Sequence, residues 1–146
     1  MAIADDAVEA RAQGWRTLAA LHARIEDRLE KELQRAHELS VSEYTVLDVL
    51  GRQDGWHMRM QQLARAVVLS QSATTRLVTR LENRGLLRRY LCEDDRRGIY
   101  SEVTPAGCEL LAAARPVHDA VLKQVLDEAA QEPELGPLAG ALLSGG

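Results

Sequence analysis

The sequence predicts a mainly α-helical protein with a small β-hairpin, an α+β fold. Hydrophobic residues recur with helical spacing over most of the chain, and two short strand-like runs flank one polar turn near its middle. The 146 residues are 46% hydrophobic and 27% charged, which are ordinary values for a globular protein. The length suits one compact lobe together with an oligomerisation element.

The composition excludes several other classes of protein. No apolar run approaches the ~18 residues that a membrane span needs, and the acidic start lacks the basic region of a signal peptide. Two cysteines, Cys92 and Cys108, are too few for a disulfide framework or a zinc site. A cytoplasmic protein without membrane contact is therefore expected.

A long helix over residues 7–37 opens the chain. Its apolar side chains recur at intervals of three, four and seven residues: Trp15, Leu18, Ile25, Leu29 and Leu33. This helix is longer than a small domain usually wraps around one core, so a second chain is expected to cover part of it. Ser40 or Ser42 caps the next helix, which ends at Gly51.

The middle of the chain combines short helices with short strands. A brief strand at 57–60 precedes a helix at 62–68, and Ser70 then caps a helix that runs to Arg84 and stops before Gly85. Strands at 86–93 and 99–103 enclose a polar turn. Two helices joined by a tight turn and followed by a β-hairpin form a winged helix-turn-helix.

The last third of the chain is helical. Thr104 and Pro105 open a long helix that Pro116 should kink, and a short helix follows at 138–143. Three regions are therefore expected: a dimerisation helix at 1–37, a winged helix-turn-helix lobe at 38–104 and dimerisation helices at 105–146.

The charge is divided unevenly along the chain. Residues 55–97 hold nine arginines against four carboxylates, whereas acids outnumber bases on both sides, and the whole chain carries −4. A basic middle between acidic flanks is expected when one lobe faces a polyanion.

The helix after Ser70 has an outward face without a carboxylate. Small hydroxyls allow close approach to DNA, and arginine forms bidentate contacts with guanine. The alternative is an ordinary solvated face, but such faces usually mix charge signs, and Glu82 is the only acid of this helix. The predicted DNA contacts are Ser70, Gln71, Ser72, Thr74, Thr75, Arg76, Thr79 and Arg80.

The polar turn of the hairpin offers a second contact with DNA. Arg96 and Arg97 could enter a narrow minor groove, with Asp95 orienting one of them. The alternative is a plain charged turn.

The runs LARAVVLSQSATTRLVTRLENRGLLRR and EDDRRGIYSEVTPAG resemble the winged-helix core of the MarR family of transcriptional regulators. The resemblance covers residues 45–110 closely. It implies a homodimer that binds double-stranded DNA at a palindromic operator and represses transcription. It also implies release by a small, often phenolic, effector or by an oxidant.

Several residues are candidates for sensing a signal. Trp15, His22 and Tyr44 could line an aromatic effector pocket, although core or dimer packing explains them more simply. His37 and His118 show no metal-ligand spacing, so neither a metal nor a cofactor is expected. Cys92 and Cys108 raise the alternative of an oxidant-sensing regulator, although acidic neighbours disfavour their thiolates.

No motif of an enzyme is present: the chain has neither a phosphate-binding loop nor a nucleophile elbow, so no catalytic residue is expected. The remaining alternative is a winged helix that binds only proteins. The acid-free helix face argues against it.

Overall fold

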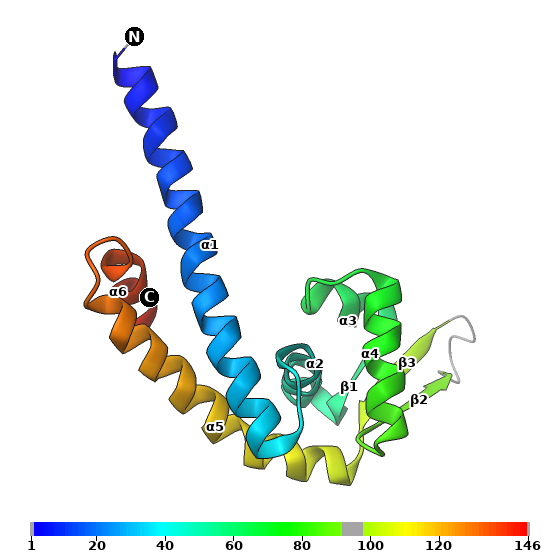
Figure 1. The fold of residues 1–146 in the computed structure, drawn as a ribbon. Coiled ribbons are helices and arrows are strands. Elements are labelled where there is room, and N and C mark those ends of the chain that lie inside the picture. The colour runs from blue at the N-terminus through cyan, green and yellow to red at the C-terminus, as the bar shows by residue number, and fades with distance from the viewer. Residues whose placement is uncertain (1, 92–97, 146) are drawn as a thin grey trace. The chain divides into compact units, whose positions relative to one another are not determined.

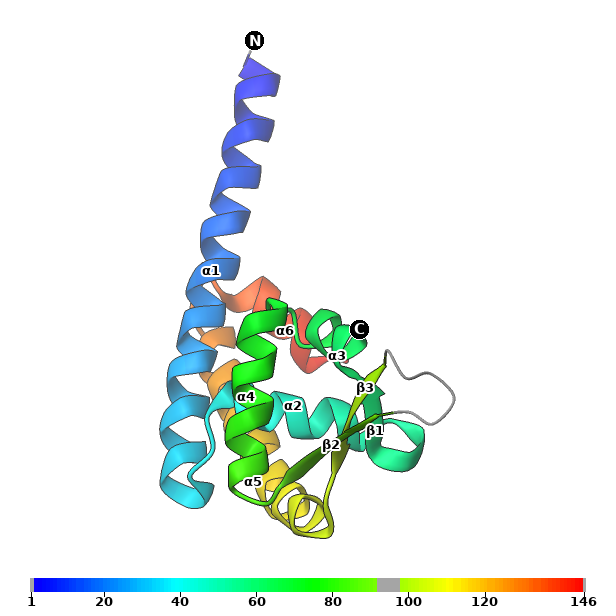
Figure 2. The same cartoon turned by 90° about the vertical axis from the view of Figure 1, so that its right-hand side faces the viewer.

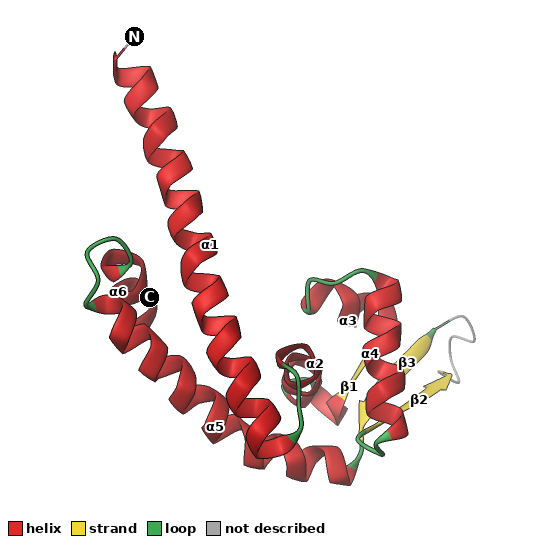
Figure 3. Cartoon of the chain, in the orientation of Figure 1, coloured by secondary structure: helices red, strands yellow, loops and turns green. Residues whose placement is uncertain are grey.

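The computed structural model describes residues 2–91 and 98–145 of the chain (Figures 1 and 3). The elements are α1 (Ala2–His37), α2 (Val41–Gly51), a 3-10 turn (Asp54–Trp56), β1 (His57–Arg59), α3 (Met60–Ala66), α4 (Gln71–Asn83), β2 (Leu87–Leu91), β3 (Ile99–Val103), α5 (Pro105–Ala130) and α6 (Gly136–Leu143). They divide into two compact units, one formed by residues 33–116 and the other by the rest of the chain.

The unit of residues 33–116 is a winged helix-turn-helix, as the sequence predicts. Helices α2, α3 and α4 pack on one another and on an antiparallel sheet with strand order β1-β3-β2. Figure 2 shows β2 and β3 running side by side from the C-terminal end of α4. The core of the unit contains fully buried aliphatic side chains: Val46, Leu47, Leu50, Leu63, Val78 and Leu81.

Local signals in the sequence fix the ends of α2 and α4. Ser40 and Glu43 form a capping box, in which the Ser40 hydroxyl accepts from the Glu43 amide at 3.0 Å and the Glu43 carboxylate from the Ser40 amide at 2.9 Å. The Ser70 hydroxyl caps α4 by accepting from the Ala73 amide at 3.1 Å. Helix α4 ends at Asn83, and the φ of 75° at the following Gly85 lets the Leu86 amide donate back to the Leu81 carbonyl.

In its described part, the other unit has helices as its only regular secondary structure, with a turn at 131–135 between α5 and α6. Leu21 of α1 packs with Leu126 and Ala129 of α5 and with Leu135 and Ala139 around α6. Ion pairs between Arg24 and Glu132, and between Arg28 and Glu128, lie beside this core. No helix in the described part of the chain is long and apolar enough to cross a membrane.

The structure corrects the expected bounds of three helices: α1 begins at Ala2 instead of 7, α6 begins at Gly136 instead of 138, and α3 is shifted at both ends. Helix α3 occupies 60–66 instead of 62–68. It begins early because Arg59 has an extended N-cap conformation, and it ends early because Val68 has a φ of 58°, which a right-handed helix does not allow. Helix α5 continues through Pro116 without interruption.

An ion-pair network joins α2 to α5 inside the winged-helix unit. The Asp48 carboxylate accepts from Arg52 Nε at 3.1 Å and from Arg115 Nη2 at 2.9 Å. Partial burial alone would raise the pKa of Asp48, but the hydrogen bonds and charges of Arg52 and Arg115 together hold it below its ordinary value.

Replacing Asp48 by asparagine should therefore destabilise the protein in a pH-dependent way. The stabilisation is complete above the pKa of an unfolded aspartate, about 3.9, and is lost as the pH falls through the lower folded pKa. We expect the variant to have a lower urea midpoint than the wild type at neutral pH, with the difference shrinking below about pH 4. Asp27→Asn is the control. Asp27 pairs with Lys31 on the exposed surface, so its replacement should change the urea midpoint little. A difference for Asp48→Asn that does not change with pH would contradict the electrostatic explanation.

Candidate nucleic-acid interface

Helix α4 has one buried face and one exposed polar face. Leu77, Val78 and Leu81 are buried against the rest of the unit. The opposite side exposes the side chains that the sequence predicts to contact DNA: Gln71, Ser72, Thr75, Arg76 and Arg80. No carboxylate lies among them. The amphipathic pattern therefore orients α4 as expected.

The prediction that Thr74 contacts DNA is wrong. Its side chain is fully buried, and its hydroxyl donates to the Ser70 carbonyl at 2.9 Å. The helical spacing explains this position, because Thr74 lies one turn from Leu77 and Val78 on the buried side. Threonine is small enough to fill such a core position when its hydroxyl is satisfied by the helix backbone.

Two other threonines of α4 keep their hydroxyl protons within the helix. Thr75 donates to the Gln71 carbonyl at 2.9 Å, and Thr79 to the Thr75 carbonyl at 2.8 Å. The half-buried Thr79 hydroxyl also accepts from Arg89 at 3.1 Å. In this conformation the exposed donors of the face are Gln71, Ser72, Arg76 and Arg80, which is a smaller set than the sequence suggests.

The arginines of the basic middle segment fall into two groups. Arg84, Arg88 and Arg89 each pair with a carboxylate, respectively Glu43, Glu102 and Glu82. Arg84 also donates to the Glu38 carbonyl at 2.7 Å, so it connects the end of α4 to the end of α1. By contrast, Arg65, Arg76 and Arg80 form no ion pair with residues 2–91 or 98–145. Within the described residues, α3 and α4 therefore carry arginines whose charge no carboxylate neutralises.

The stem of the hairpin carries an aromatic cluster that the sequence reasoning missed. Arg59, Tyr100 and Tyr90 lie opposite one another across β1, β3 and β2. The rings of Tyr90 and Tyr100 stack with their centroids 5.6 Å apart, and the Tyr90 hydroxyl lies 3.1 Å from His57 Nδ1. Only the strand register brings these residues together, because Arg59 lies 41 positions from Tyr100 and His57 lies 33 positions from Tyr90 in the chain. The predicted hairpin contacts Asp95, Arg96 and Arg97 lie outside the described residues.

The predicted effector residues lie in different units. Trp15 is 70% exposed on α1, and His22 is also exposed, with its Nε2 atom 3.7 Å from Glu26. Tyr44 belongs to the winged-helix unit and is buried. The pocket that these three residues could line stays a prediction.

The chemistry of the described cysteine does not favour redox sensing. Cys108 is partly buried, and burial raises the pKa of its thiol, which disfavours the reactive thiolate. Cys92 lies outside the described residues. Within the described ranges, no three histidine, cysteine or acidic side chains gather as a metal site would require.

A helix-turn-helix whose second helix has a polar, acid-free face and is followed by a β-hairpin defines a class of DNA-binding proteins, in which that second helix enters the major groove. The comparisons with known proteins agree. Residues 37–98 match the sequence model of the MarR family. The transcriptional regulator HosA of Escherichia coli O157:H7 is 31% identical over 67% of this chain and 72% of its own length.

Solved structures give the same result over more of the chain. AbsC, a MarR family transcriptional regulator from Streptomyces coelicolor, is 33% identical with a TM-score of 0.74, covering 90% of this chain and 93% of its own. Sco3205, a MarR family regulator from the same organism solved in complex with DNA, is 28% identical with a TM-score of 0.76. The match covers 89% of this chain and 81% of the Sco3205 chain. The chain belongs to the MarR family of transcriptional regulators, and it is a DNA-binding regulator.

Proposed function

We propose that the protein is a homodimeric cytoplasmic repressor that places one α4 helix and one hairpin from each chain on a palindromic operator. It acts by binding and carries out no reaction. The observation that carries the proposal is the exposed face of α4, where Arg76 and Arg80 have no acidic partner in the described part of the chain. The predicted hairpin contacts Asp95, Arg96 and Arg97 complete the proposed interface.

Exposed apolar side chains support the dimer. Val8, Trp15 and Leu18 of α1 are 59%, 70% and 49% exposed, and Leu142 of α6 is 54% exposed. A soluble chain that exposes several large apolar side chains on one helix usually covers them with a partner. We propose that a second copy of this chain is that partner and that the regions 1–37 and 105–146 provide the interface.

The test begins with selection of duplexes from a random-sequence library by the purified protein. We expect the enriched sequences to contain an inverted repeat with half-site centres about 10 bp apart. Two chains should bind each duplex, and affinity should fall steeply as salt concentration rises. A protein that enriches no sequence would be better described as a protein-interaction module. A monomer on DNA would contradict the dimer.

We further propose that a small aromatic effector releases the DNA, with Trp15, His22 and Tyr44 as its predicted contacts. Salicylate is a suitable probe. A ligand that prefers the conformation unable to bind DNA must stabilise the free protein and weaken operator binding together. We expect salicylate to raise the Tm and also the apparent Kd for the selected duplex. A higher Tm with an unchanged Kd would show a site that is not coupled to DNA binding.

A further inference from the structure

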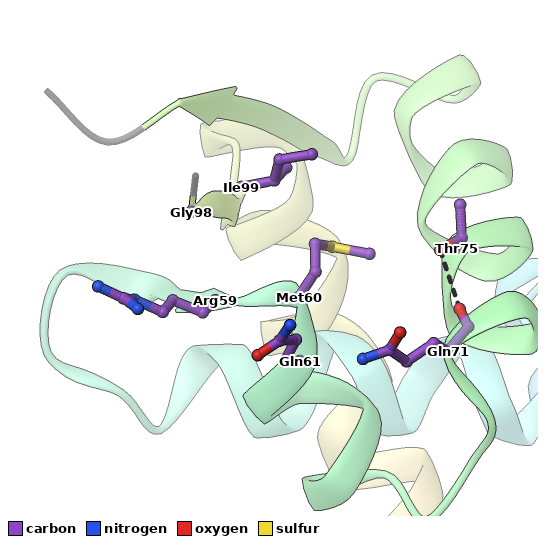
Figure 4. A pocket seen from close by; sticks show the side chains of 7 residues that line it. All are labelled: Arg59, Met60, Gln61, Gln71, Thr75, Gly98 and Ile99. Carbon is purple, nitrogen blue, oxygen red and sulfur yellow. Dashed lines mark hydrogen bonds between the residues drawn. The ribbon is translucent and has the colours of Figure 1, made fainter. Parts of the chain in front are cut away.

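A pocket of about 330 Å³ lies between α4 and the start of β3 (Figure 4). Three parts of the winged-helix unit form its walls: the junction of β1 with α3, the first turns of α4, and the beginning of β3. The residues that line it are Arg59, Met60, Gln61, Gln71, Thr75, Gly98 and Ile99.

The lining of the pocket combines groups that can bind an anion with apolar side chains. Its described lining contains one cation, Arg59, and no carboxylate. Figure 4 shows the side chain of Gln71 extending from α4 toward Gln61, so two amide groups lie near the same opening. Met60 and Ile99 supply apolar surface beside them. A phosphate attached to a sugar matches this combination, because guanidinium and amide N–H groups donate to phosphate while the sugar contacts apolar atoms.

The location of the pocket identifies the phosphate. Under the proposed function, on which this inference rests, α4 lies in a major groove and the hairpin lies on the adjacent minor groove. One sugar-phosphate strand separates two adjacent grooves of a duplex, so this strand must pass between α4 and the hairpin. We propose that the pocket holds a phosphodiester of this strand and that Arg59 is its charged contact.

The fold positions Arg59 for this role. Arg59 is the N-cap residue of α3, where a serine or threonine would cap the helix, but its side chain makes no capping hydrogen bond. Instead, its Nε donates to the Tyr100 hydroxyl at 3.1 Å, and its guanidinium lies 5.7 Å from the centre of the Tyr100 ring. Tyr100 is held in turn by the stack with Tyr90. A guanidinium that is already oriented loses less conformational freedom when it binds.

The first test measures affinity against salt concentration for the selected duplex and for a scrambled duplex. Arg59→Ala should weaken binding to both by a similar factor, about tenfold at ~0.1 M salt. The slope of log affinity against log salt should fall by about one unit for each bound chain. Arg59→Lys keeps the charge and should keep most of the slope. Thermal unfolding of each variant checks that the fold is intact.

Arg88→Ala is the matched control. Arg88 lies on the same sheet, packs over Tyr90 and pairs with Glu102, but it does not line the pocket. We expect its removal to leave the salt slope unchanged. An equal loss of slope in Arg59→Ala and Arg88→Ala would mean that the general charge of the sheet is responsible, and it would overturn the proposal.

The second test locates the phosphate. Single phosphates of the selected duplex are replaced by uncharged methylphosphonates, and each duplex is titrated with wild type and Arg59→Ala. One replacement in each half-site, between the two groove contacts, should weaken the wild type but leave Arg59→Ala unaffected. If every replacement weakens both proteins equally, Arg59 contacts no phosphate and the proposal fails. If the wild-type protein shows no preference for any duplex, the proposed function itself fails, and the proposed phosphate site fails with it.

Discussion

Arg76→Ala should lower affinity for the selected operator by roughly 1–3 kcal/mol and should flatten base preference at one position of each half-site. Arg76 lies in the middle of the exposed face of α4, and no acidic side chain in the described part of the chain neutralises it. An arginine in this position can donate two parallel hydrogen bonds to the O6 and N7 atoms of a guanine. Titration of a set of single-base operator variants measures both effects.

Arg76→Lys separates base recognition from charge. Lysine keeps the positive charge but loses the planar fork that matches guanine. We expect this variant to keep the salt dependence of the wild type and to lose most of the base preference. An Arg76→Ala protein that binds the operator as tightly as the wild type would show that this face of α4 does not contact the bases.

The contrast between Arg59 and Arg76 distinguishes two kinds of contact with DNA. Loss of a phosphate contact should weaken all sequences alike, whereas loss of a base contact should mainly weaken the preferred sequence. Arg59 lines the pocket between α4 and β3, and Arg76 lies on the α4 face itself. If the two variants had the same effect on the operator and on scrambled DNA, one of these assignments would be wrong.

Sequence reasoning succeeded where the cause of a structure lies within a few residues. Ser40 and Ser70 begin helices because their hydroxyls reach amides three residues ahead. Gly85 ends α4 because the chain needs a positive φ there. The helical repeat also separated the buried Leu77 from the exposed Arg76.

It failed where the cause depends on residues that are distant in the chain. The arginines of the basic segment look alike in sequence, yet Arg84 and Arg88 are neutralised by Glu43 and Glu102, which lie 41 and 14 positions away. The same limit explains why the Arg59 and Tyr100 pair was missed, because only the register of β1 with β3 brings the two residues together.

The turn between α3 and α4 shows a third kind of failure. Val68 adopts a φ of 58° although its side chain is β-branched and 86% exposed. Backbone propensity disfavours this conformation for valine. The turn forms nonetheless, with the Val68 amide bonded to the Arg65 carbonyl and the Leu69 amide to the Ala64 carbonyl. The packing of α3 against α4 therefore overrides a local preference at this position.

Gly107→Ala should destabilise the protein strongly, although helix propensity alone predicts the opposite. Gly107 lies in the first turn of α5, where alanine is intrinsically better than glycine by about 1 kcal/mol. A Cβ atom at this position would lie 2.2 Å from the Leu86 carbonyl oxygen and 2.6 Å from Val103 Cγ1. Real Cβ atoms do not approach backbone oxygen so closely, so the start of α5 would have to move.

The surrounding hydrogen bonds oppose this movement. The Thr104 amide donates to the Leu86 carbonyl at 3.1 Å, and the Thr104 hydroxyl donates to the Gly85 carbonyl and accepts from the Gly107 amide at 3.1 Å. Overpacking typically lowers the free energy of unfolding by about 1–3 kcal/mol. Because the clash at Gly107 is with backbone atoms that cannot easily move, we expect a loss of about 3 kcal/mol or more. The clash should therefore outweigh the gain in helix propensity.

Gly14→Ala is the matched control for this prediction. Gly14 lies inside α1, and no described atom comes within 4 Å of a Cβ placed there. The same substitution should therefore stabilise the protein by about 0.5–1 kcal/mol. Urea unfolding of both variants at one protein concentration gives the comparison, since the stability of a dimer depends on concentration. Helix propensity alone predicts that Gly107→Ala stabilises the protein, and only the close approach of α5 to the Gly85–Leu86 backbone predicts that it destabilises it. A Gly107→Ala protein at least as stable as the wild type would therefore refute that close approach.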